Sequence, residues 1–109
     1  MDQAEINKIQ DLIKRTLKDY LPLKELYAEW DESWDSSEFL ELLFHDLEIA
    51  LEHMPGYFLK KGTNIEKWEN SMEYHRLKID CELVSQINEL TPQEIIARRN
   101  KEVVKLLTN

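Results

Sequence analysis

Glycine, proline and cysteine are all scarce in this chain. Its 109 residues include two glycines, three prolines and one cysteine, Cys81. Hairpins, sandwiches and barrels need frequent turn residues, so this composition favours an all-α fold. A single cysteine also excludes an internal disulfide framework and a zinc site built from several thiolates. We therefore expect a helical protein from a reducing compartment.

Long apolar runs and a secretory leader are missing as well. No apolar stretch approaches the length of a membrane span, and the first residues lack the basic start and apolar core of a signal peptide. Hydrophobic residues make up 42% of the chain and charged residues 33%, as in globular proteins. The sequence predicts a single domain, residues 1–109, that is cytoplasmic and does not contact membrane.

Apolar residues recur at intervals of three or four along most of the chain, which is the period of an amphipathic helix. The helices expected from this period span residues 3–20, 23–31, 36–53, 63–90 and 92–107. Three capping boxes support these starts: Asp35 with Glu38, Thr63 with Glu66, and Thr91 with Glu94. We expect a compact antiparallel bundle of about five helices. The helix over 36–53 is the most apolar and should be central, whereas 63–90 should form one brace of about 40 Å.

The negative charge is concentrated in residues 24–52. This segment holds ten acids and one base, whereas the rest of the chain carries a net charge of +1, giving −8 in total. A strongly acidic surface repels nucleic acid and anionic membrane, and it accelerates encounters with basic partners. The sequence therefore predicts a basic protein partner and no binding to nucleic acid.

Patterns typical of catalysis or metal binding do not occur. Cys81 lies within a predicted helix without a base that would activate it, and His75 lies on an apolar face. The arginine and histidine pair of HEPN ribonucleases is missing. Glu41, His45 and Glu48 share a helix face, but no second helix supplies matching ligands. We expect a protein that is not an enzyme, with no catalytic residue, no metal and no cofactor.

Aromatic residues alternate with acids between Tyr27 and Glu41. Aromatic side chains are enriched at the centres of protein interfaces, and acids around them can pair with lysine and arginine of a basic partner. The pattern leaves open whether Trp30 faces the core or a partner. It favours an exposed position for Trp34, which follows a polar turn and has no apolar residue at helical spacing except Trp30.

The run from Ser36 to Glu48 resembles the acidic helix, rich in leucine and phenylalanine, of the colicin D-type immunity family. Residues 39–42 are also similar to the specificity helix of the immunity proteins of DNase colicins. A tyrosine pair follows that helix in the family, and Tyr57 with Phe58 is the nearest counterpart here. The family's proteins are shorter and have four helices. This resemblance to immunity proteins, including those of contact-dependent inhibition, implies a protein that blocks a nuclease toxin domain.

The predicted function is accordingly that of an immunity protein or inhibitor, acting as a monomer or dimer. A phage-type acidic mimic of nucleic acid that inhibits a defence nuclease, a helical metal-binding protein and an oligomeric scaffold remain as alternatives. The predicted partner-binding residues are Glu29, Asp31, Glu32, Trp34, Asp35, Glu38, Glu41, His45, Glu48, Glu52, Tyr57 and Phe58.

Overall fold

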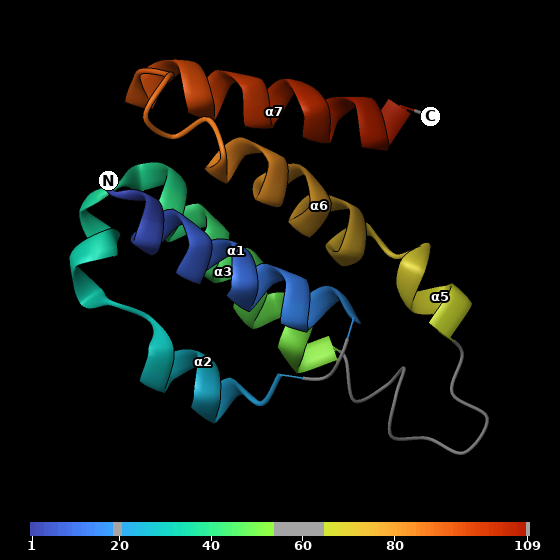
Figure 1. The fold of residues 1–109 in the computed structure, drawn as a ribbon. Coiled ribbons are helices and arrows are strands. Elements are labelled where there is room, and N and C mark those ends of the chain that lie inside the picture. The colour runs from blue at the N-terminus through green and yellow to red at the C-terminus, as the bar shows by residue number, and fades with distance from the viewer. Residues whose placement is uncertain (19–20, 54–64, 109) are drawn as a thin grey trace.

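The chain folds into a bundle of α-helices, shown by a computed structural model that describes residues 1–18, 21–53 and 65–108 (Figure 1). The elements are α1 (Gln3–Lys18), α2 (Leu23–Glu29), the 3-10 helix η1 (Glu32–Ser36), α3 (Glu38–His53), α5 (Ile65–Glu69), α6 (Met72–Val84) and α7 (Pro92–Thr108). The predicted all-α fold is confirmed. Within the described residues, no helix has the length and apolar character needed to cross a bilayer.

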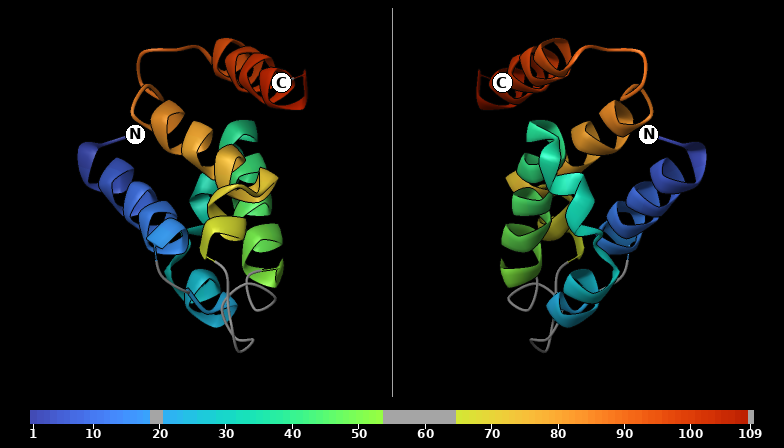
Figure 2. Two further views of the ribbon diagram at one scale, coloured as in Figure 1. Left: turned by 90° about the vertical axis from the view of Figure 1, so that its right-hand side faces the viewer. Right: turned by 90° about the vertical axis from the view of Figure 1, so that its left-hand side faces the viewer.

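Helices α3 and α6 form the middle of the bundle. Helix α3 packs against α1, α2, η1, α6 and α7, and α6 packs against α1, α3, α5 and α7. Their inward side chains, such as Leu43 and Leu77, are fully buried together with Ile9 and Ile13 of α1. Figure 2 shows α7 at one end of the molecule and α2 at the other. The central place expected for the third helix is therefore confirmed.

The start of α3 differs from the predicted capping box. The helix begins at Glu38, and the hydroxyl of Ser37 accepts a hydrogen bond from the backbone N–H of Leu40 at 3.3 Å. Asp35 instead accepts a hydrogen bond from the indole of Trp30 at 3.0 Å. The prediction that Asp35 caps this helix was wrong, because Asp35 belongs to η1 and a serine stands closer to the first helical turn.

The long helix expected over residues 63–90 is divided in the structure. Helix α5 ends at Glu69, and Ser71 caps α6 by accepting a hydrogen bond from the backbone N–H of Tyr74. After Val84 the backbone forms i to i+3 hydrogen bonds, which tighten the chain into turns over 85–89. The single brace was a wrong prediction, since the apolar period continues through both breaks. Thr63, of the second predicted capping box, lies outside the described residues.

The third capping box is confirmed at the start of α7. Glu94 N–H donates to the hydroxyl of Thr91, and Thr91 N–H donates to the Glu94 carboxylate, both at 3.1 Å. Although α7 has seventeen residues, Ile95 is the one residue of this helix that is buried. The helix therefore lies on the bundle with much of its surface free of contacts.

Candidate protein-binding face

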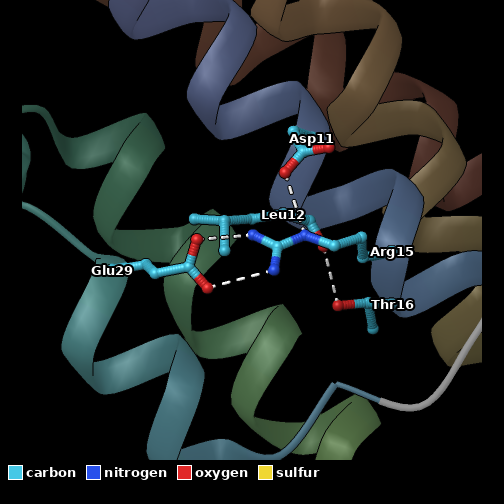
Figure 3. Close-up of polar contacts among 5 residues, drawn as sticks. All are labelled: Asp11, Leu12, Arg15, Thr16 and Glu29. Carbon is cyan, nitrogen blue, oxygen red and sulfur yellow. Dashed lines mark hydrogen bonds and ion pairs between the residues drawn. The ribbon is translucent and has the colours of Figure 1, made fainter.

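The acids of residues 24–52 divide into those held by contacts within the fold and those that face solvent without a partner. Figure 3 shows one of the first group. The Arg15 guanidinium on α1 donates two hydrogen bonds to the Glu29 carboxylate on α2, at 2.7 and 3.1 Å. Arg15 also lies 2.9 Å from Asp11. The hydrogen bonds from Arg15 lower the pKa of Glu29. Glu29 therefore has a structural role, joining α1 to α2.

Asp31 and Asp35 also have structural roles at η1. The Asp31 carboxylate caps η1 by accepting a hydrogen bond from the backbone N–H of Ser33 at 2.9 Å, and this bond lowers the pKa of Asp31. Asp35 accepts the hydrogen bond of the Trp30 indole. Both carboxylates are exposed on their outer side, but each also holds the turn before α3 in place.

Trp34 is buried, with 3% of its surface exposed, which corrects the expectation that it faces solvent. Its indole N–H donates to the Glu5 carboxylate of α1 at 3.3 Å, and its ring meets that of Trp30 edge to face at 4.9 Å. Trp30, which contacts Phe44 on its other side, is also buried. Both tryptophans are core residues, so neither presents its ring to a partner.

One face of α3 carries most of the acids that remain available, and Glu25 of α2 and Glu32 of η1 are exposed as well. Glu38, Glu41, His45, Glu48 and Glu52 alternate at spacings of three and four, so they form one row, called here the acidic stripe. The opposite side of α3 is buried against the core. Glu38 and Glu41 are exposed, and their side chains form no hydrogen bond or ion pair with any residue that the structure describes. Their charges are therefore not neutralised by the fold.

The middle of the stripe is partly tied to α2. The hydroxyl of Tyr27 donates to the Glu48 carboxylate at 2.8 Å, and this bond raises the pKa of Tyr27. The ring of His45 is exposed and lies 4.0 Å from Glu48. Glu52 in the last turn of α3 and Glu32 in η1 are both exposed. Tyr57 and Phe58, predicted as packing anchors, lie outside the described residues.

The metal-binding hypothesis placed ligands at Glu41, His45 and Glu48. In the part of the chain that the structure describes, no group of three histidine, cysteine, aspartate or glutamate side chains is arranged to hold a metal ion. Cys81 is half-buried, and burial raises the pKa of its thiol. A raised pKa disfavours the thiolate, which is the form that attacks substrates or binds metals.

A buried ion cluster attaches α7 to the two central helices. Arg99 of α7 contacts Asp46 of α3 at 2.6 Å and Asp80 of α6 at 3.1 Å. All three side chains are largely buried. Desolvation and the neighbouring Asp46 raise the pKa of Asp80 well above its ordinary value. Asp46 is therefore an acid of the segment whose charge is used inside the fold.

Beside the acidic stripe, the first turns of α3 and α7 enclose two adjoining hollows of about 300 and 470 Å³. Glu38 and Pro92 line both hollows, and Ile96, Ala97 and Asn100 line the smaller one. Sequence reasoning did not single out this groove. The available signal was the lack of charge at 93, 96, 97, 100, 103, 104 and 107, which together form one flank of α7.

The stripe and the groove share Glu38, which belongs to the stripe and lines both hollows, so carboxylates on α3 begin where uncharged side chains of α7 line the groove. The exposed carboxylates can pair with lysine or arginine, and the hollows can accept an apolar side chain. The chain matches no protein-family model, no curated protein sequence and no solved structure.

Proposed function

We propose that this protein is an inhibitor of the immunity type, which binds a basic nuclease toxin domain through the acidic stripe of α3. The observation that carries the proposal is the pair Glu38 and Glu41, which are exposed on a helix that the core holds in place and have no partner among the described residues. Nuclease sites hold lysine and arginine for substrate phosphates. Carboxylates fixed on a helix can occupy the same electrostatic field.

The division of the acids supports this proposal. Glu29, Asp31 and Asp35 are engaged in structural contacts, so their presence is accounted for by the fold. Glu38 and Glu41 lie in the first turn of α3, where a carboxylate also favours the helix dipole, but their side chains form no contact of this kind with any described residue. Like charges one turn apart on a helix repel each other, and no described residue places a cation against the Glu38 or Glu41 carboxylate, so both charges are available to a basic partner.

The product of the adjacent gene is the first partner to test. We expect it to carry a basic nuclease domain, to co-purify with this chain, and to lose nuclease activity when the chain is added in equal amount. Association should slow steeply between about 0.05 M and 0.3 M salt, since steering is screened over this range. A neighbour that encodes no basic domain, or a nuclease that stays fully active in the presence of this chain, would contradict the proposal.

A matched pair of variants tests the surface itself. Glu38→Gln/Glu41→Gln removes two charges from the stripe, and Glu66→Gln/Glu69→Gln removes two charges at the same spacing from exposed positions of α5. The stripe variant should lower the association rate about tenfold or more, whereas the α5 variant should change it by less than about twofold. Equal effects of the two variants would show that net charge, and not the stripe, governs binding.

A further inference from the structure

The acidic stripe by itself does not provide the apolar contacts that stabilise most specific complexes. Rim charges mainly set the association rate, and affinity comes from side chains buried in well-packed pockets. Trp30 and Trp34 are in the core, so they cannot act as anchors inserted into a partner. An anchor can also come from the partner, provided that this chain offers a pocket next to the stripe.

The groove between α3 and α7 offers such a pocket. Both hollows are lined by uncharged residues and by one acid, Glu38. The larger hollow adds Phe39, Ile87, Leu90 and Ile95 as apolar walls. Its volume of about 470 Å³ is enough for one or two large side chains. The groove therefore combines an apolar interior with a carboxylate at its edge.

Each of the two helices continues the groove with a row of uncharged side chains. Leu42 and Ile49 of α3 are partly exposed. They lie on the side of α3 that faces α7, where Asp46 contacts Arg99. On α7 the matching flank carries Ile96, Ala97 and Asn100 and, further on, Val104 and Leu107, which are 54% and 62% exposed. The first turns of both helices line the same hollow, with Glu38 on α3 and Pro92 on α7. Beyond that point the two helices diverge (Figures 1 and 2).

We propose that this groove receives an amphipathic basic helix of the partner, with its apolar side chains against Ile96 and its arginine or lysine residues paired with Glu38 and Glu41. This inference rests on the proposed function, because it assigns the binding mode to the same acidic face. Charge complementarity selects the occupant: Glu38 lies at the edge of an otherwise uncharged groove and Glu41 follows it one turn along α3, so a complementary helix carries cations beside its apolar stripe. Recognition of this kind places an amphipathic helix in an apolar groove.

The direct test uses a synthetic amphipathic peptide of about 18 residues, built from leucine and arginine, and a scrambled peptide of the same composition. Spectra of the protein labelled at isoleucine, leucine and valine methyl groups should show peptide-induced shifts at Leu42, Leu90 and Ile96. The amphipathic peptide should bind about tenfold or more tightly than the scrambled one, because burial of apolar side chains is lost on scrambling. Equal binding of both peptides, or shifts centred on α1 and α2, would overturn the proposal.

Two alanine variants provide the matched control. Ala97→Arg puts bulk and positive charge into the groove, and Ala4→Arg makes the same change on the exposed outer side of α1. Peptide affinity should fall about tenfold or more in Ala97→Arg and less than about twofold in Ala4→Arg. If sedimentation shows that Ala97→Arg instead converts a dimer of the parent protein to a monomer, a second copy fills the groove and the proposal is wrong.

The peptide assay and the assay on the adjacent gene product can contradict the groove proposal and the inhibitor proposal independently. A nuclease that is captured through Glu38 and Glu41 but is indifferent to Ala97→Arg would leave the proposed function standing and remove the groove. A peptide that binds in the groove, without any inhibited nuclease, would retain the groove as a site for basic helices and remove the inhibitor function.

Discussion

Arg99 is the side chain on which the attachment of α7 most depends. It is 11% exposed and contacts two buried carboxylates, on α3 and α6. Removing the cation would leave Asp46 and Asp80 facing each other in a site with little water. We expect Arg99→Met to lower the free energy of unfolding by about 3–5 kcal/mol, measured by urea titration.

The neighbouring arginine is the control for this prediction. Arg98 is exposed and donates a hydrogen bond to Gln86, so Arg98→Met should cost less than about 1 kcal/mol. Similar losses in the two variants would mean that α7 is held by its apolar contacts and that the ion cluster contributes little.

Asp80 should make stability depend on pH in the opposite sense to a carboxylate whose pKa the fold lowers, such as Glu29. Burial, with the nearby Asp46 carboxylate, raises its pKa well above the ordinary value of 3.8. Folding thus favours the protonated form. The stabilisation is complete below the ordinary pKa and is lost as pH rises through the raised pKa of the folded state.

Asp80→Asn should abolish this loss, because the amide does not ionise. Between about pH 4 and pH 7, the free energy of unfolding of the variant should rise relative to that of the parent protein. Glu82→Gln, at an exposed position two residues further on, is the control and should not reproduce this rise. A relative fall for Asp80→Asn with rising pH would indicate that the ionised Asp80 is the form that Arg99 stabilises.

Single side chains also show where sequence reasoning reaches its limit. Local spacing identified the acids, but it could not distinguish Glu29 from Glu41, because the partner that engages Glu29 is Arg15, fourteen positions away. Trp34 was assigned to the surface for the same reason. The spacing indicated Trp30 as its apolar neighbour, but the contact with Glu5 forms across the bundle, so no helical period in its own segment reveals it.

At the level of the elements, α7 depends on its capping box as well as on Arg99. Thr91 and Glu94 satisfy each other's backbone N–H groups, and the bond from Thr91 lowers the pKa of Glu94. Thr91→Ala removes the hydroxyl that accepts from Glu94. We expect it to lower the free energy of unfolding by about 1 kcal/mol and to increase hydrogen exchange in the first turns of α7.

Thr108 provides a comparison at the other end of the same helix. Its hydroxyl donates to the Val104 carbonyl in the last turn, which does not cap the helix. Thr108→Ala should change the free energy of unfolding by less than about 0.5 kcal/mol. Fast exchange in the first turns of the Thr108→Ala variant would contradict the special role given to Thr91.

The elements differ in how far their sequences predicted them. The bounds of α1, α3 and α7 lie within about two residues of the predicted ranges because each carries one uninterrupted apolar face. The break between α5 and α6 was missed because Asn70 and Ser71 interrupt the helix without interrupting the apolar series that includes Trp68 and Met72. A periodic pattern records which side chains face inward, and it does not record continuity of the backbone.

For the whole molecule, the charge of −8 and its distribution were readable from the sequence, whereas the binding face was not. Some of the acids form structural contacts within the fold, and others lie in the exposed stripe of α3. The groove next to the stripe depends on α7, which lies more than fifty residues later in the chain than Glu38. Such a surface exists only when α3 and α7 pack together, so the pattern of either helix alone could not define it.

The same distribution of charge predicts a conflict between stability and binding. Glu41→Gln/Glu52→Gln removes one acid from the first turn of α3, where a carboxylate favours the helix dipole, and one from the last turn, where a carboxylate opposes it. The two dipole effects largely cancel, and both changes relieve repulsion within the stripe, so the free energy of unfolding should rise by about 0.5 kcal/mol at low salt. Calorimetric melting at low and high salt should show this gain shrinking as salt is added, because screening weakens the repulsion.

Binding of the Glu41→Gln/Glu52→Gln variant to the basic partner should weaken. Glu69→Gln/Glu89→Gln gives the same net charge away from the stripe and should leave binding nearly unchanged. If the stripe variant instead binds as tightly as the parent protein and is no more stable, these acids of α3 affect neither binding nor stability.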